Sequence, residues 1–94
     1  MWGGIFEVKS GSRTEILHHG DQETITFLLF GACEIRWGPK GEFSALAKQG
    51  DFIHVPAHLA HMEINQSKVH PFRRVVVRST PTPIVVNLPE NVWP

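Results

Sequence analysis

The sequence predicts a small all-β domain, either a sandwich or a closed barrel. Three observations in its 94 residues support this fold class. No segment of useful length repeats its apolar residues with the period of a helix. Short runs rich in β-branched and aromatic residues follow one another instead, and Gly, Pro, Asn or Asp separates them at intervals of about ten residues. Many short, evenly spaced strands in one small domain are typical of a sandwich or barrel.

The strand boundaries follow from these turn residues. We expect strands at residues 5–9, 24–30, 33–37, 43–47, 52–55, 62–64, 72–78 and 84–86. Gly31 stops the apolar run before it, and Pro56 ends its strand because proline has no N–H for a ladder hydrogen bond. From the alternation, the core is expected to contain Ile25, Phe27, Leu29, Phe52 and Val76. Residues 80–94 are expected to form one strand and a tail that packs on a neighbour or on the barrel.

Composition excludes several classes of function. Nine Lys plus Arg balance nine Asp plus Glu, so nothing directs the protein to nucleic acid or to an anionic membrane. The single cysteine, Cys33, excludes an internal disulfide framework, fits a reducing compartment and is expected to be a small buried hydrophobe. The N-terminus has no signal-peptide pattern, and no apolar stretch has the length of a membrane span. We therefore expect one soluble, cytoplasmic domain over residues 1–94.

The histidines suggest where the chemistry lies. Five of the six fall in two short windows, residues 17–23 and residues 50–65. Imidazole nitrogens with an occasional carboxylate are ligands for Fe, Mn, Ni, Zn or Cu, and such sites are assembled from strands distant in sequence. Adjacent residues of a strand point to opposite faces, so His18 and His19 can both point inward only from a bulge or a loop.

The two windows carry a family resemblance. In the second, Gly50, Pro56, His61 and Asn65 stand at the spacing of the second cupin motif, with His58 at a turn position where the family usually has Gly. In the first, over residues 11–31, the order of glycines, histidines and glutamate resembles the first cupin motif. The chain resembles the small single-domain, RmlC-like members of the cupin superfamily over roughly residues 3 to 79. The resemblance implies a double-stranded β-helix, or jelly-roll barrel.

The resemblance also implies a metal site, normally of three histidines and one carboxylate. Here the candidate ligands for one divalent transition metal are His18, His19, Glu23 and His61. The first motif departs from the family, because Leu17 stands in the place of its first histidine. Counting back from Gly31 puts Thr24, rather than Glu23, in the place of the carboxylate. Each candidate has a structural alternative, namely a hydrogen-bonded histidine or, for Glu23, a solvated carboxylate.

Three functions follow as expectations. The first is a metal-dependent enzyme, similar to a dioxygenase, decarboxylase or isomerase, acting on a small organic substrate with His54 or Glu63 moving protons. His54 has an alternative as a hydrogen-bonded wall residue. The second is a non-catalytic module that binds or senses a metal or small ligand. The third is a metal-free sugar-nucleotide epimerase or isomerase with a His–Asp pair, for which Asp21 and Asp51 stand only in turns.

We also expect a homodimer, because small cupins usually pair. The material for its interface would be the short N-terminal strand and the apolar tail. The tail residues concerned are Val85, Val86, Leu88, Val92 and Trp93. No nucleic acid or membrane partner is expected.

Overall fold

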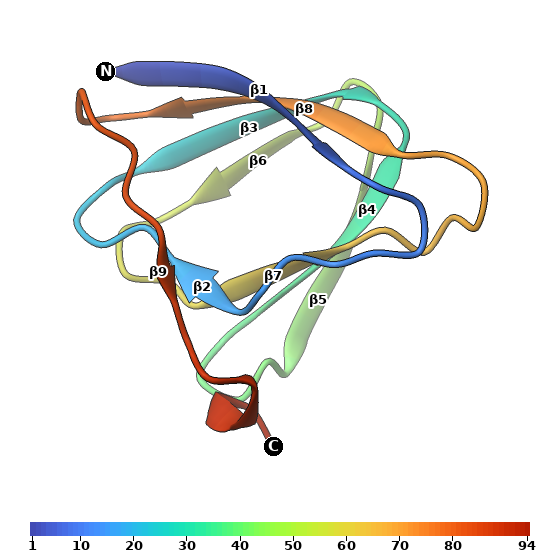
Figure 1. Ribbon diagram of the computed structural model, residues 1–94. Helices are drawn as coiled ribbons and strands as arrows, with labels where there is room; N and C mark the ends of the chain where they lie inside the picture. Colours follow the sequence, from blue (N-terminus) through green and yellow to red (C-terminus); the bar gives the residue numbers. More distant parts are fainter.

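Two antiparallel sheets face each other in the computed structural model, which describes residues 1–94 (Figure 1). The strands are β1 (Trp2–Val8), β2 (Leu17–His18), β3 (Thr24–Phe30), β4 (Ala32–Trp37), β5 (Phe43–Lys48), β6 (Phe52–Val55), β7 (His61–Ile64), β8 (Phe72–Arg78) and β9 (Val86–Asn87). One 3-10 turn, η1 (Glu90–Val92), follows them. One sheet has the order β1-β8-β3-β6 and the other β5-β4-β7-β2-β9. Every ladder is antiparallel, and most of them join strands far apart in the sequence.

The predicted strands are present, with differences at the ends of the chain. The first strand begins at Trp2 because Gly3 and Gly4 pair with Val77 and Val76 of β8. The expected strand at 84–86 is reduced to β9. The two-residue strand β2 was not predicted, because a pair of residues has no periodicity; Leu17 pairs with His61 of β7 and with Asn87 of β9.

The core consists of two small clusters rather than one. Val8, Leu28, Cys33, Ala47 and Phe72 form the first, and Ile16, Met62 and Trp93 form the second. Cys33 is buried as expected, and burial raises the pKa of its thiol to about 12, so the thiol is neutral and unreactive at neutral pH. Only 21 of the 94 residues are buried. The barrel interior is therefore not filled by apolar side chains alone.

The sequence predicted the wrong face of β3 as its core face, because the expected alternation was shifted by one residue. Ile25 and Leu29 are exposed, and the side chains that point inward are Thr24, Thr26 and Leu28. Phe52 of the neighbouring β6 is also exposed, at 72%, whereas Val76 of β8 is buried as expected. Thr24 to Phe27 alternate polar and apolar and thus favoured the wrong face, whereas Leu28 to Phe30 are apolar at both phases and could not correct it.

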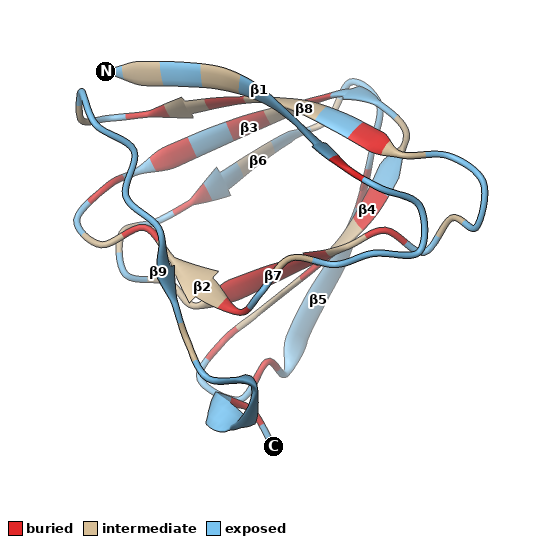
Figure 2. Ribbon diagram, in the orientation of Figure 1, coloured by how far each residue is buried: buried red, intermediate tan, exposed pale blue.

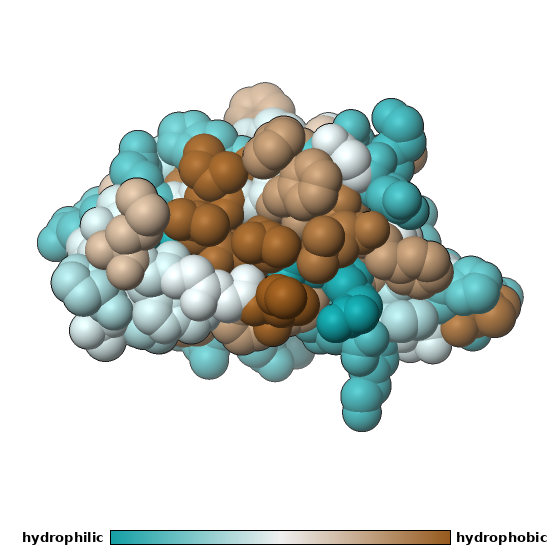
Figure 3. Space-filling view, turned by 90° about the horizontal axis from the view of Figure 1, so that it is seen from above, coloured by the Kyte–Doolittle hydropathy of each residue, from teal (hydrophilic) through white to brown (hydrophobic).

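The outer surface of the β1-β8-β3-β6 sheet is consequently apolar. Seen from above, hydrophobic side chains cover its centre (Figure 3). The registers align Ile5, Val75, Phe27 and Phe52 in one row across the four strands, and Val77 and Ile25 in the next. Burial along β3 and β8 changes from residue to residue, as strands with one inward and one outward face require (Figure 2).

The C-terminal tail packs on its own barrel. The Trp93 ring is buried against Gly41, where any side chain would collide with it, and the Arg36 guanidinium lies 5.2 Å from the ring centroid. Leu88 donates its N–H to the carbonyl of Ile16 at 2.7 Å. Four of the five tail residues expected in a dimer interface are thus used within the chain, since Val86 also pairs with His18 and Val85 lines the cavity between the sheets. None of the helical segments has the length and hydrophobicity of a membrane span.

Candidate functional site

A cavity of about 380 Å³ lies between the two sheets. It is lined by polar side chains from both of them, together with apolar residues such as Trp2, Phe6 and Val76. The polar residues are Thr14, His19, Thr24, Thr26, His61, Glu63, Arg74 and Arg78. Two larger hollows, of about 560 and 480 Å³, open more widely to solvent.

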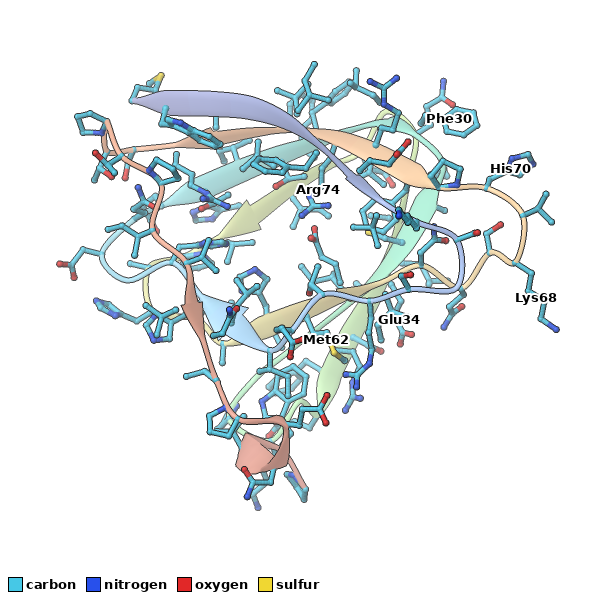
Figure 4. All side chains as sticks on the ribbon, viewed as in Figure 1. Phe30, Glu34, Met62, Lys68, His70 and Arg74 are labelled. Carbon is cyan, nitrogen blue, oxygen red and sulfur yellow. The ribbon has the colours of Figure 1, made fainter.

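Strand alternation explains how these side chains reach the cavity. On β8, Val76 is buried and faces inward, so Arg74 and Arg78, two residues away on either side, face inward with it. Arg74 points from β8 into the space between the sheets, whereas Phe30 and His70 lie away from it (Figure 4). The same alternation on β7 turns His61 and Glu63 inward and Met62 into the second core cluster.

His19 and His61 form a buried pair at the centre of the site. Their ring centroids are 4.9 Å apart, and each residue is 5% exposed. Nδ1 of His19 lies 2.9 Å from the carbonyl oxygen of Ile84, and Nδ1 of His61 lies 2.9 Å from that of Leu59. Because a carbonyl only accepts hydrogen bonds, both Nδ1 atoms carry the proton, and both Nε2 atoms keep a free lone pair.

Both histidines are neutral at pH 7. The pKa of His19 is lowered from 6.5 to about 4, mainly by burial; the hydrogen bond to Ile84 opposes this shift, and the positive charge of Arg78 adds to it. Burial also lowers the pKa of His61, as do the positive charges of Arg74 and Arg78. The pair can therefore accept a hydrogen bond, a proton or a metal ion at Nε2.

The charged residues of the cavity are Glu63, Arg74 and Arg78. Arg74 Nη2 lies 2.8 Å from Glu63 Oε2, and these side chains are only 13% and 8% exposed. Burial raises the pKa of Glu63, although the two guanidinium groups oppose the rise. Arg78 has no ion pair; it lies 5.3 Å from the ring centroid of Trp2, and burial together with Arg74 lowers its pKa.

Polar atoms without a protein partner concentrate in this cavity. Four buried side-chain nitrogen or oxygen atoms in the whole chain have no hydrogen-bond partner, and three of them belong to cavity residues. These three are Thr24 Oγ1, Arg74 Nη1 and Arg78 Nε. A buried polar group without a partner costs roughly 1–3 kcal/mol, more if it is charged. Such atoms call for a hydrogen-bond partner from outside the chain, such as a ligand, a water molecule or an ion.

The remaining sequence-predicted residues lie outside the cavity. His18 points away from His19, and its Nδ1 accepts the N–H of Gly20 at 3.0 Å. Glu23 is exposed on the outer surface, where Oε2 accepts the N–H of Ala57 at 2.6 Å and Oε1 lies 3.4 Å from His54 Nε2. No bulge therefore brings His18 inward, and Thr24 takes the inward position that the count from Gly31 assigned to it.

His58 occupies its turn in the left-handed conformation, with a φ of 60°. This φ explains why the family usually has Gly there. The strain is offset by a hydrogen bond from its N–H to the carbonyl of Gly20 at 2.8 Å and by contact with Asp21 at 2.6 Å. Asp21 is used at this exposed turn and does not reach the histidine pair of the cavity.

The cavity residues do not form a complete set of metal ligands. No three His, Cys, Asp or Glu side chains come together in a way that could hold an ion. His19 and His61 meet, but Leu17 and Thr24 stand in two of the usual ligand places and Glu63 is paired with Arg74. Two guanidinium groups in the same cavity also oppose a cation. The predicted metal therefore rests on two of its four predicted ligands.

Sequence reasoning missed Arg74 and Arg78. A signal was available, because Val76 was expected in the core and residues two apart on a strand share a face. With Val76 inside, both arginines had to point inward with it.

Comparison with known proteins identifies the fold. No family model matches the chain, and neither does any curated protein. Among solved structures, a conserved protein with a double-stranded β-helix domain from Klebsiella pneumoniae has a TM-score of 0.78 at 16% identity, over 90% of this chain and 71% of that one. Oxalate decarboxylase from Lactobacillus farciminis, in complex with formate, has a TM-score of 0.82 at 18% identity, over 92% of this chain.

The second match covers only 26% of the oxalate decarboxylase chain, so this chain spans about a quarter of that enzyme. A protein from Thermus thermophilus has a TM-score of 0.70 at 23% identity, over 83% of this chain and 70% of that one. Likeness at such low identity establishes architecture and not activity. The chain is a double-stranded β-helix of the cupin type, as its sequence predicted.

Proposed function

We propose that the chain binds a small organic molecule in the cavity between its sheets and needs no metal ion to do so. The observation that carries this proposal is the concentration of unpartnered, buried polar atoms around one cavity of about 380 Å³. Cavities of a few hundred cubic ångströms with a few convergent polar groups typically bind small molecules. Neither of the two larger hollows is lined by any of the unpartnered atoms.

A cavity-filling variant tests this proposal. Thr26 points into the cavity beside Val76, its partner on the adjacent strand β8. Thr26→Phe should therefore fill the space that a ligand occupies. Leu46→Phe, on the exposed surface of β5, is the matched control. A panel of small organic acids, alcohols and sugars is screened by thermal shift and by backbone amide NMR. Binding that survives in Leu46→Phe and disappears in Thr26→Phe supports the proposal; a panel without any such ligand contradicts it.

The metal-dependent enzyme implied by the sequence makes a different prediction. Its ion would have to be held by His19 and His61, the only two predicted ligands in the cavity. We expect no stoichiometric metal after titration with Zn²⁺, Ni²⁺, Mn²⁺ or Fe²⁺ and gel filtration. One equivalent of metal that is retained by the wild type and lost in His61→Ala would overturn the metal-free proposal.

A second candidate function, acid–base catalysis without a metal, is favoured by the free Nε2 atoms of the histidine pair. A neutral imidazole can take a proton from a carbon next to a carbonyl, leaving the electron pair on the carbonyl oxygen as an enolate that the guanidinium groups stabilise. In D₂O the carbon would then receive a deuteron. NMR of pyruvate with the protein should show methyl exchange faster than in buffer, and this exchange should be lost in His61→Gln. Exchange equal to that in buffer contradicts this second function.

A further inference from the structure

We infer that the ligand of this cavity is a small carboxylic acid that also carries a hydroxyl group, with the carboxylate held by Arg74 and Arg78. This inference rests on the proposed function and assigns its ligand class. It follows from three properties of the cavity: its net charge, its free donors and its free acceptors.

The charge of the cavity favours a monoanion. Its charged lining residues are two arginines and one glutamate, which together give a net charge of plus one while both histidines are neutral. Glu63 is in contact with Arg74, so Arg78 shares the field of that one carboxylate and has no ion pair of its own. A buried charge is strongly destabilising without an opposite charge nearby. A carboxylate supplies one negative charge, whereas a phosphate would bring close to two beside the carboxylate of Glu63.

The free donors have the form that a carboxylate requires. Arg78 Nε and Arg74 Nη1 are buried N–H groups without a protein acceptor, Thr24 Oγ1 is likewise without a partner, and all three residues line the cavity. Aromatic rings hold both guanidinium groups: Trp2 lies 5.3 Å from Arg78, and Phe72 lies 5.4 Å from Arg74. A guanidinium stacked on an aromatic ring keeps its in-plane donors available, and those donors match the two oxygens of a carboxylate.

The free acceptors account for the hydroxyl group. Because Ile84 and Leu59 fix the proton of each imidazole on Nδ1, the Nε2 atoms of His19 and His61 can only accept. A simple carboxylate has no hydrogen to donate to them. A hydroxyl group in the same ligand does, so a hydroxy acid satisfies both sets of groups in the cavity.

Calorimetric titration with four probes tests the assignment. Lactate has the carboxylate and the hydroxyl, propionate lacks the hydroxyl, 1,2-propanediol replaces the carboxylate by a neutral group, and inorganic phosphate is the competing anion. We expect lactate to bind most tightly, propionate several-fold more weakly, and propanediol and phosphate at least tenfold more weakly. If propanediol binds with the affinity of lactate, the ligand is not an acid. If phosphate binds more tightly than lactate, the anionic group is not a carboxylate. Propionate that binds as tightly as lactate removes the hydroxyl from the assignment.

Matched arginine variants locate the binding. Arg78→Gln should weaken lactate binding at least tenfold, and Arg78→Lys should restore it only in part, because lysine keeps the charge but not the paired donors. Arg73→Gln is the control, since Arg73 lies on the same strand but is exposed on the outer face. Arg78→Gln should still fold, because it breaks no ion pair and removes a buried charge; circular dichroism and thermal unfolding check this. Lactate binding that is unchanged in Arg78→Gln, or equally weakened in Arg73→Gln, contradicts the inference.

Failure of this inference is distinguishable from failure of the proposed function. If neutral ligands bind and Thr26→Phe blocks them, the cavity is a binding site and only the ligand class is wrong. If no probe of either kind binds in a manner sensitive to Thr26→Phe, both the proposed function and the inference fail.

Discussion

The two faces of the β1-β8-β3-β6 sheet reverse the usual arrangement of an antiparallel sheet. Such sheets normally turn apolar side chains to the interior and polar ones to solvent. Here β3 and β8 turn Thr24, Thr26, Arg74 and Arg78 inward, while the outer face carries the apolar row of Ile5, Val75, Phe27 and Phe52. At the Leu28 and Phe72 end of the same strands the normal arrangement returns, with both side chains fully buried.

The difference separates the part of the barrel that stabilises the fold from the part that binds. The Leu28 end forms the larger apolar cluster, and its packing needs no ligand. The Arg78 end keeps polar groups buried at a cost in stability, which is the pattern of a functional site. The predictions below test the polar inner face first and the apolar outer face last.

The largest effect is expected from breaking the buried ion pair. Glu63→Ala leaves the largely buried Arg74 guanidinium without its carboxylate, and removal of one partner of a buried pair costs about 3–5 kcal/mol. Urea unfolding should show this loss. Glu7→Ala, at an exposed position of β1, should change the free energy of unfolding by less than about 0.5 kcal/mol. Equal effects of the two substitutions would show that the inner face is solvated rather than buried.

The next effect concerns pH. Because the folded pKa of His19 lies near 4 and the unfolded value near 6.5, the unfolded chain binds the proton first as the pH falls. The stability that neutral His19 contributes is complete above pH 6.5 and is lost progressively down to about pH 4. The pKa difference corresponds to about 3 kcal/mol.

The charged or titratable groups that influence the pKa of His19 are Arg78, His61 and His18, and Glu63 of the same cavity has a raised pKa of its own. The comparison is therefore made between variants. Between pH 7 and pH 4, the free energy of unfolding should fall by about 3 kcal/mol less in His19→Gln than in wild type. His70→Gln, at an exposed loop position, should follow the wild-type curve. Parallel curves for all three proteins would contradict the buried, neutral histidine pair.

Sequence reasoning could predict the architecture but only half of the site. Turn residues and β-branched runs located the long strands, and the spacing around Gly50 and His61 indicated the barrel type. The phase of β3 could not be read, because Ile25, Phe27 and Leu29 are as apolar as a core stripe although they lie outside. Alternation did indicate that His18 and His19 diverge unless a bulge or loop intervenes, and in the structure only His19 lines the cavity. The pairing of Glu63 on β7 with Arg74 on β8 could be found only once the two sheets are placed against each other.

The smallest change in stability is expected on the outer face, where the homodimer predicted from the sequence can be tested. The centre of this face carries the two apolar rows described above, and no charged side chain lies between them. Because two apolar surfaces need no matching charges, the same face of a second molecule can pack against it. We propose a second copy of this chain as its occupant. Light scattering should show a dimer for wild type and for Leu46→Glu, and a monomer for Phe52→Glu, with both variants folded. A wild-type monomer at micromolar concentration, or a dimer that survives in Phe52→Glu, would contradict this interface.

The claim that the inner face is a binding site for an acid is tested most directly at the arginine atoms themselves. The ¹H–¹⁵N signals of the arginine Nε–H groups can be followed while lactate is added. Arg78 Nε is buried without a protein acceptor, whereas Arg73 lies on the exposed face of the same strand. We predict a saturable shift of the Arg78 signal with no shift at Arg73, and loss of the Arg78 shift in Thr26→Phe. An Arg78 signal that does not move, or that moves in step with Arg73, would contradict the account.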